Sequence, residues 1–279
     1  MSQKSYNGKN SVYLIPTPIG NLEDITLRSI NMLKYVDVIF SEDTRKTRQL
    51  LNHLEIQKKL IASHKFNEFE NKEKLLKFLN DGLNVGIVTD RGTPIISDPG
   101  EIITKYAIEE NYNVIALPGA TAFVPALIVS GLNAEHFYFF GFLNSKESKA
   151  KKELENLKNI KDTLIFYEAP HRIDKTLKIL ENILGDRKIS ISREISKKFE
   201  EVYRGTISEV KKEIEGAKGE MVIVVDGNKE VIDYNDIPIS EHVNMYMISG
   251  LDKKESMKKV AKDRCVSKSE IYKIYNRGE

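Results

Sequence analysis

Short runs rich in β-branched and aromatic residues recur along the first 120 residues, and longer helix-like segments separate them. The runs are VYLI from Val12, VDVIF from Val36, LIAS from Leu60, VGIVT from Val85 and NVIAL from Asn113. The segments between them, such as 26–35 and 68–79, carry apolar residues at helical spacing behind polar or acidic starts. This alternation predicts an α/β fold in which helices connect parallel strands.

The pattern changes after LPGATA, which starts at Leu117. Further strands are predicted at FYFFG, TLIFY, KISISRE, EEVYRGT and EMVIVVDG, starting at Phe137, Thr163, Lys188, Glu200 and Glu220. Some of these strands follow one another directly, so we expect a mixed second sheet. The sequence therefore predicts a parallel α/β domain over 1–117 and a mixed α/β domain over 118–228.

A basic tail of three helix-like segments is predicted over 240–279, roughly at 240–249, 253–264 and 267–275, with Ser267 as the N-cap of the last. Residues 251–277 hold nine Lys or Arg against four Asp or Glu, a local charge of +5 in a chain of net charge +2, which leaves about −3 for the rest. Such short helices joined by tight turns resemble a helix-turn-helix unit. The tail can equally be a packing appendage or a dimer arm.

Composition limits where the chain works and what it can bind. A hydrophobic fraction of 41% and a charged fraction of 30% are typical of a globular protein. The single cysteine, Cys265, has no partner for a disulfide or a zinc site, so we expect a cytoplasmic protein. The apolar run near the N-terminus is too short for a signal peptide or a membrane span. The five histidines have no metal-ligand spacing, so we expect no metal.

Glycine and proline cluster at the ends of three predicted strands. The clusters are PTPIGNLEDIT from Pro16, TDRGTPIISDPGE from Thr89 and LPGATAF from Leu117. Ligands of open α/β sheets bind at this edge, where glycine lets the backbone approach closely. No cluster matches a P-loop or the GxGxxG fingerprint. A nucleotide-like ligand other than an ordinary NTP or NAD is therefore expected.

An ordered series of six motifs resembles that of the ribosomal RNA methyltransferases in the tetrapyrrole methylase family, which are class III S-adenosylmethionine-dependent enzymes. The motifs are YLIPTPIGNLEDIT, SEDTRKTRQLL, TDRGTPIISDPG, ALPGATA, FYEAPHR and REISKKFEEVYRGT, and the likeness spans Val12 to Gly227. The resemblance implies two α/β domains with S-adenosylmethionine between them, usually in a homodimer. It also implies 2′-O-methylation of a cytidine in the decoding region of small-subunit (16S) rRNA, free or in the assembled 30S subunit.

The resemblance also implies a set of cofactor contacts, mostly through backbone or apolar groups. They fall on Pro18, Asp90, Arg91, Gly92, Thr93, Ile96, Thr121, Ala122, Tyr167 and Glu168. Arg91 departs from the pattern, because this subfamily commonly has alanine there. Its guanidinium can pair with the carboxylate of the cofactor's methionine end, pair with Asp90, or point into solvent.

Methyl transfer from a sulfonium to a ribose hydroxyl is an in-line displacement, so it depends on positioning and is helped by a nearby base. The candidate catalytic residues are Glu42, Asp43, Glu168 and His171. Glu42 and Asp43 follow a predicted strand, and Asp43 is equally suited to capping the next helix.

Basic residues in the same motifs are the candidate phosphate contacts. They are Arg45, Lys46, Arg48, Arg172, Lys197, Lys198 and Arg204. The alternative for each is a solvated charged face.

Two other functions stay open. One is a methyltransferase of the same fold that acts on a tetrapyrrole or on a protein side chain. The other is a non-catalytic nucleic-acid-binding regulator that senses a metabolite. The combination of GTPIISDPG, YEAPHR and SKKFEE with a basic tail favours the rRNA substrate.

Overall fold

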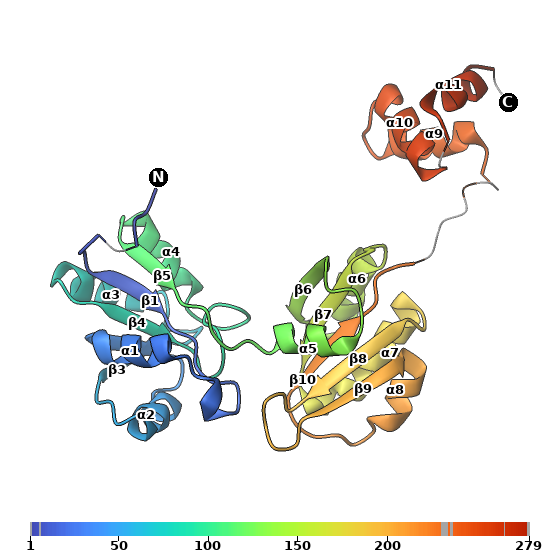
Figure 1. Ribbon diagram of the computed structural model, residues 1–279. Coiled ribbons are helices and arrows are strands. Elements are labelled where there is room, and N and C mark those ends of the chain that lie inside the picture. The colour runs from blue at the N-terminus through green and yellow to red at the C-terminus, as the bar shows by residue number, and fades with distance from the viewer. Residues whose placement is uncertain (1, 6, 230–233, 235–236, 265, 278–279) are drawn as a thin grey trace. The chain divides into compact units, whose positions relative to one another are not determined.

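The computed structural model describes residues 2–5, 7–229, 234, 237–264 and 266–277, so Cys265 lies outside the described residues. The chain divides into two compact units, Met1–Asn228 and Lys229–Glu279. The larger unit holds two five-stranded sheets and the smaller unit holds helices. The expected fold class, two α/β sheets followed by C-terminal helices, is confirmed (Figure 1).

The first sheet has the strand order β3-β2-β4-β1-β5, and all its pairings are parallel as expected. The strands are β1 (Ser11–Leu14), β2 (Val38–Ser41), β3 (Lys59–Ala62), β4 (Val85–Val88) and β5 (Asn113–Ala116). Alternate residues of β1 enter different cores, with Val12 on one face and Tyr13 on the other. Both faces of this parallel sheet are therefore buried.

Two helices cover each face of the first sheet. Those on the Val12 side are α3 (Asn71–Asn80) and α4 (Glu101–Glu109); those on the Tyr13 side are α1 (Leu27–Tyr35) and α2 (Thr44–His53). The neighbours β1 and β4 are thus followed by helices on opposite faces, since β1 leads to α1 and β4 leads to α4. Such a switch point opens a crevice at the carboxyl ends of the two strands.

The second sheet has the order β6-β7-β10-β8-β9 and is mixed, as expected. Its strands are β6 (Phe137–Phe142), β7 (Thr163–Glu168), β8 (Lys188–Arg193), β9 (Glu201–Thr206) and β10 (Met221–Val225). Only β6 and β7 pair in parallel. The short 3-10 turns η1 (Leu22–Asp24) and η2 (Pro170–Arg172) precede α1 and α7 (Ile173–Leu184).

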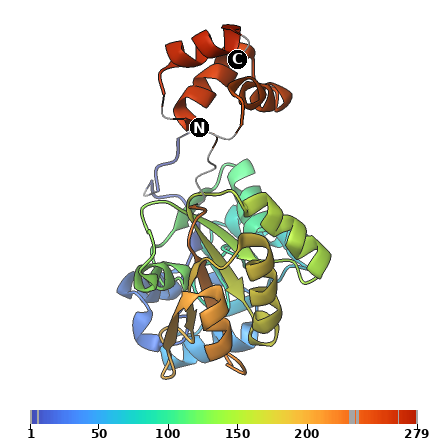
Figure 2. The same ribbon diagram turned by 90° about the vertical axis from the view of Figure 1, so that its right-hand side faces the viewer.

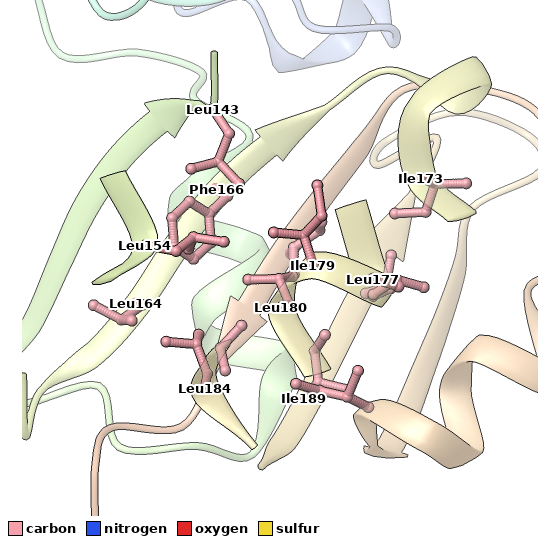
Figure 3. Packing of buried hydrophobic residues seen from close by; sticks show 14 of the residues in the cluster. Leu143, Leu154, Leu164, Phe166, Ile173, Leu177, Ile179, Leu180, Leu184 and Ile189 are labelled. Carbon is pink, nitrogen blue, oxygen red and sulfur yellow. The ribbon is translucent and has the colours of Figure 1, made fainter. Parts of the chain in front are cut away.

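Helices also cover both faces of the second sheet. One face packs against α6 (Glu147–Leu157), α7 (Ile173–Leu184) and α8 (Ile207–Glu213), in a core that includes Phe166 and Leu180 (Figure 3). The other face packs against α5 (Phe123–Ser130) through Ala126 and Leu127.

The smaller unit is a bundle of three helices, drawn in red in Figure 2. They are α9 (Ile239–Ile248), α10 (Lys253–Asp263) and α11 (Lys268–Arg277), and all three were expected. Their core is formed by Val243, Met257, Val260, Ala261 and Ile271. The hydroxyl of Ser267 accepts a hydrogen bond from the N–H of Glu270 at 3.2 Å, which confirms the predicted N-cap.

No helix in the described part of the chain is long and apolar enough to cross a membrane.

Candidate active site

A cavity of about 430 Å³ is lined by loops that follow strands of both sheets. Eight predicted cofactor contacts line it: Arg91, Gly92, Thr93, Ile96, Thr121, Ala122, Tyr167 and Glu168. Pro18 and Asp90 are not in its wall; Pro18 is buried beside the lining residue Ile19, and Asp90 lies in an adjacent polar network. The cavity wall thus includes the loops after β1 and β4, where the switch point predicts a ligand.

The loops after β1 and β4 are joined by two backbone hydrogen bonds. The N–H of Thr17 donates to the carbonyl of Gly92 at 2.9 Å, and the N–H of Gly92 donates to the carbonyl of Thr17 at 3.0 Å. Gly92 has φ +81°, and a Cβ there would lie 3.2 Å from Ile19 Cγ2 and 3.4 Å from the carbonyl oxygen of Ala120. Both the backbone conformation and the space therefore favour glycine.

The loop between β4 and α4 contains two non-glycine residues in left-handed backbone conformations. Ile95 has φ +78° and Ser97 has φ +65°. This is costly, above all for a β-branched residue, and such strain persists only where the surrounding structure holds it. Ser97 and its neighbours Ile96 and Asp98 line the cavity, so the strained backbone forms part of its wall.

The side chain of Glu68 fixes the end of this loop. It is 4% exposed, and its Oε1 accepts hydrogen bonds from the N–H groups of Gly100, Ile102 and Ile103 at 3.0, 2.7 and 3.2 Å. A carboxylate at a helix N-terminus satisfies unpaired N–H groups and the helix dipole. The pattern predicts a helix from 68, whereas α3 begins at Asn71 and the Glu68 side chain binds the N-terminus of α4.

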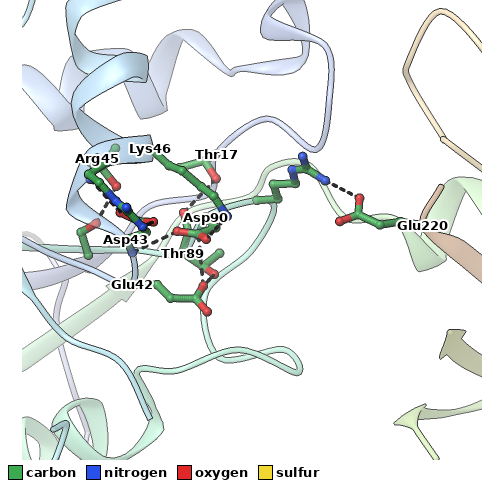
Figure 4. A network of polar contacts seen from close by, with 11 residues as sticks. Thr17, Glu42, Asp43, Arg45, Lys46, Thr89, Asp90 and Glu220 are labelled. Atoms are coloured by element: carbon green, nitrogen blue, oxygen red, sulfur yellow. Dashed lines mark hydrogen bonds and ion pairs between the residues drawn. The ribbon is translucent and has the colours of Figure 1, made fainter. Parts of the chain in front are cut away.

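Glu42 and Asp90 belong to a polar network at the ends of β2 and β4 (Figure 4). Glu42 Oε2 accepts from the hydroxyl of Thr89 at 2.9 Å and from the N–H of Asp90 at 3.4 Å. Asp90 accepts from the N–H of Asp43 at 3.0 Å and pairs with Lys46 at 2.5 Å. The candidate base Glu42 is thus held next to the β4 loop.

Asp98 is a site residue that the sequence analysis missed. It lines the cavity, and burial, followed by the negative charge of Glu42, raises the pKa of its carboxyl to about 7. A carboxyl with such a pKa can exchange a proton at neutral pH. The only sequence signal is an acidic residue in the SDPG segment, because the pKa shift depends on groups distant in sequence.

Asp43 is the N-cap of α2. Its carboxylate accepts from the N–H of Arg45 at 2.9 Å and forms an ion pair with the guanidinium of Arg45 at 2.8 Å. Hydrogen bonding from Arg45 holds the pKa of Asp43 well below its usual range. The carboxylate therefore remains ionised at neutral pH and is a weak base. The capping role that the sequence allowed for Asp43 is present.

Glu168 lines the cavity, but its carboxylate already has several partners. It is 2% exposed, accepts from the N–H of Ala169 at 2.8 Å and from the hydroxyl of Thr176 at 2.6 Å, and pairs with Arg172 at 3.2 Å. These bonds fix the turn between β7 and α7, where the other candidate, His171, is exposed.

The predicted phosphate contacts are distributed over several elements. Arg45 and Lys46 pair with Asp43 and Asp90. Three others donate to backbone carbonyls: Arg48 to Lys58, Arg172 to Leu143 and Arg204 to Val129. Lys198 is exposed beside the ring of Phe199. Lys197 lines the cavity instead.

Arg91 turns toward the second sheet. Its Nη1 lies 2.5 Å from Glu220 Oε2. The carboxylate of Asp90 pairs with Lys46 instead (Figure 4). Lys197 Nζ lies 3.0 Å from the same Glu220 oxygen and 2.8 Å from Glu194 Oε1. Of the three possibilities for Arg91, pairing with Asp90 is thus not observed, and these four charged side chains line one part of the cavity.

The described residues contain no group of three or more His, Cys, Asp and Glu side chains arranged to hold a metal ion.

Residues 11–211 match the family model of tetrapyrrole (corrin/porphyrin) methylases. Over 285 residues the chain is 45% identical to "Ribosomal RNA small subunit methyltransferase I" of Bacillus subtilis (strain 168), with 98% of each chain covered. It is 44% identical over 286 residues to the protein of the same name from Halalkalibacterium halodurans, with 99% of each chain covered.

The fold is also similar to that of solved structures. The uroporphyrin-III C-methyl transferase of Thermus thermophilus, in complex with S-adenyl homocysteine, superposes with a TM-score of 0.55 at 21% identity. The match covers 77% of this chain and 97% of that one. The likeness at this identity concerns the fold.

Proposed function

The chain belongs to the tetrapyrrole (corrin/porphyrin) methylase family, and we propose that it transfers a methyl group from S-adenosylmethionine to the ribose 2′-hydroxyl of a cytidine in the decoding region of 16S rRNA. Full-length likeness to small-subunit rRNA methyltransferases supports this substrate. The observation that carries the proposal is the cavity beside the β1/β4 switch point, lined by residues of the TDRGTPIISDPG, PGATA and FYEAP motifs.

The residues of this cavity fit S-adenosylmethionine. Its volume of about 430 Å³ is within the range of small-molecule sites, roughly 300–1,000 Å³. Gly92 exposes its backbone to the cavity at a point where a Cβ would crowd the wall. Thr93, Thr121 and Ala122 line the cavity beside it. The ionised carboxylate of Asp98 in the lining suits a ligand with a positively charged sulfonium. We propose that these residues hold the cofactor.

S-adenosylmethionine supplies a methyl group on a sulfonium that a ribose oxygen can attack. The chain must orient the hydroxyl and accept its proton. Among the acidic candidates, Asp98 combines a place in the cavity wall with a pKa of about 7, raised by burial. Glu42, fixed by Thr89, supplies the negative charge that helps to keep this pKa high. We assign proton acceptance to Asp98 and a supporting role to Glu42.

We assign RNA binding mainly to the helical unit. Lys254, Lys258 and Lys262 are exposed at intervals of four residues along α10, so they form one stripe. A stripe of cations binds phosphates without reading sequence and makes affinity depend on salt. Recognition of the target cytidine then belongs to the loops around the cavity. The compartment is the one that contains ribosomes, the cytoplasm.

We also propose that the chain forms a homodimer. Helix α5 exposes Val124, Ile128 and Val129, of which Ile128 is 70% exposed. The edge strand β6 exposes Phe137 and Tyr138, at 43% and 45%. Large exposed apolar side chains on a helix and on a free strand edge are typical of an interface. In a dimer with two-fold symmetry, a second copy of the chain covers these apolar surfaces with the same surfaces of its own.

The test is methyl transfer from labelled S-adenosylmethionine to small ribosomal subunits that lack the modification, with free 16S rRNA and a uroporphyrin in parallel. We expect label in rRNA, recovered after digestion as 2′-O-methylcytidine. Transfer to the tetrapyrrole alone would overturn the rRNA assignment. Cofactor binding without any transfer would favour the metabolite-sensing regulator.

A further inference from the structure

One part of the cavity wall is a cluster of two cations and two anions contributed by both sheets. Arg91 comes from the loop after β4, Glu194 and Lys197 come from the loop after β8, and Glu220 precedes β10. The Glu220 carboxylate lies between the two cations, 2.5 Å from Arg91 and 3.0 Å from Lys197. A site that holds a carboxylate between an arginine and a lysine is a carboxylate-binding site.

We propose that Arg91 and Lys197 form the subsite for the α-carboxylate of the cofactor's methionine end, and that Glu220 stands in for this carboxylate in the structure. The inference rests on the proposed function, which supplies a ligand with a free amino acid end. It reassigns Lys197 from a phosphate contact to a cofactor contact. It also gives Arg91 a role that alanine, expected at this position from the resemblance, cannot perform.

Lys197 and Glu194 are the fixed half of the cluster. Their side chains are 20% and 22% exposed. The stem of Lys197 lies over Gly20, where a Cβ would be 2.4 Å from Lys197 Cγ. Glu194 is held by backbone hydrogen bonding with Glu220 at 3.0 Å and by its own Oε1, which accepts from the N–H of Glu220 at 3.1 Å. This half therefore keeps its geometry when a ligand enters.

Arg91 and Glu220 are the exchangeable half. Their side chains are 47% and 64% exposed, and an exposed ion pair is worth only about 0–1 kcal/mol. A ligand carboxylate delivered into the cavity by the rest of the cofactor can replace Glu220 at little cost. Glu220 then becomes available to the ligand's ammonium group, so two cations and two anions match a zwitterion. The charge of the cluster stays balanced in both arrangements.

The experiment compares two ligands that differ at the amino acid end. S-adenosylhomocysteine carries the α-carboxylate, whereas 5′-methylthioadenosine lacks the whole amino acid group. Calorimetry measures the affinity of the full-length chain for both. In Arg91→Ala we expect affinity for S-adenosylhomocysteine to fall about fivefold, the upper end for a half-exposed ion pair, while that for 5′-methylthioadenosine changes less than about twofold. Arg91→Lys should recover part of the loss.

Glu220→Gln sharpens the test because it removes the competing carboxylate. We expect it to leave 5′-methylthioadenosine unaffected and to raise the affinity for S-adenosylhomocysteine, because glutamine no longer competes for the two cations and its amide oxygen can still accept from the ammonium group. Thermal stability should not change. Lys105→Ala and Glu109→Gln, an exposed pair on α4, are the matched charge controls and should change neither ligand.

Equal losses of both ligands in Arg91→Ala, or no loss of S-adenosylhomocysteine, would overturn the subsite while leaving the proposed function intact. Failure of both ligands to bind the unaltered chain would overturn the proposed function, and the subsite with it.

Discussion

The α/β unit and the helical unit differ in how their candidate binding surfaces are built. The α/β unit builds its cavity from backbone that ordinary residues rarely adopt, with Gly92 and Ile95 in the left-handed region and a buried carboxylate, Glu68, to fix it. The helical unit has ordinary capped helices, a small apolar core and an exposed stripe of lysines on α10. Substitutions that alter this strained backbone should therefore have large effects on cofactor binding, whereas removal of lysines from the stripe should weaken RNA binding by degrees.

The largest effect is expected from Gly92→Val. A β-branched side chain at φ +81° is strained, and its Cβ would press on Ile19 and on the Ala120 carbonyl in the cavity wall. We expect a loss of at least about 3 kcal/mol in binding of S-adenosylhomocysteine, about 100-fold or more in affinity by calorimetry. Binding of rRNA in a filter assay should persist, since the lysine stripe is unaltered.

Gly82→Val is the control for backbone strain. Gly82 has φ +80°, but a Cβ added there would have no heavy atom within 4 Å, so the substitution carries the same strain in open space. If both variants lose the cofactor equally, strain rather than the cavity wall explains the result. Loss of rRNA binding in Gly92→Val would show that the two units do not act separately.

Glu68→Ala should have the next largest effect, on the stability of the α/β unit. The substitution removes the acceptor of the N–H groups of Gly100, Ile102 and Ile103, of which the first and last bonds are buried. We expect a loss of about 3 kcal/mol in the free energy of unfolding, measured with urea. Glu68→Gln keeps one acceptor oxygen and should lose less. The exposed neighbour Glu70 provides the control, and Glu70→Ala should change stability little.

The sequence was sufficient for what depends on local pattern. The alternation of strands and helices, the mixed second sheet and the Ser267 cap follow from residues near one another in the chain. Features that depend on distant residues were not predictable. Arg91 meets Glu220 at a separation of 129 residues, and the pKa of Asp98 is set by burial and by Glu42. Helix α3 begins at Asn71 rather than at Glu68, whose side chain binds the N-terminus of α4, more than 30 residues away in the sequence.

A graded effect is expected when Lys254, Lys258 and Lys262 are all changed to Gln. If these lysines contact phosphates, each contact contributes about 0.7–0.9 to the slope of log affinity against log salt. The variant should therefore bind rRNA several-fold more weakly, with the slope lower by about two, while cofactor affinity is unchanged. The same change at Lys149, Lys151 and Lys152 on α6 is the matched control. An unaltered slope would show that these lysines do not contact phosphates, and that the helical unit has a structural role.

The smallest effect tests whether Asp98 titrates as its surroundings indicate. Burial raises its pKa from the ordinary value of 3.8 to about 7, so the folded state binds this proton more tightly than the unfolded state. The stability gained from the protonated group is complete below pH 3.8 and is lost as the pH rises through 7.

The native chain should thus lose about 1 kcal/mol relative to Asp98→Asn between pH 5 and pH 8, a value that allows for solvent screening of a half-buried group. Urea unfolding at both pH values measures this difference, with Asp81→Asn at an exposed position as the control. Asparagine cannot ionise, so this loss between pH 5 and pH 8 should be absent in Asp98→Asn and present in Asp81→Asn. The same pH dependence in all three proteins would remove the basis for assigning proton acceptance to Asp98, because a carboxyl with an ordinary pKa is fully ionised at neutral pH and is a poor base.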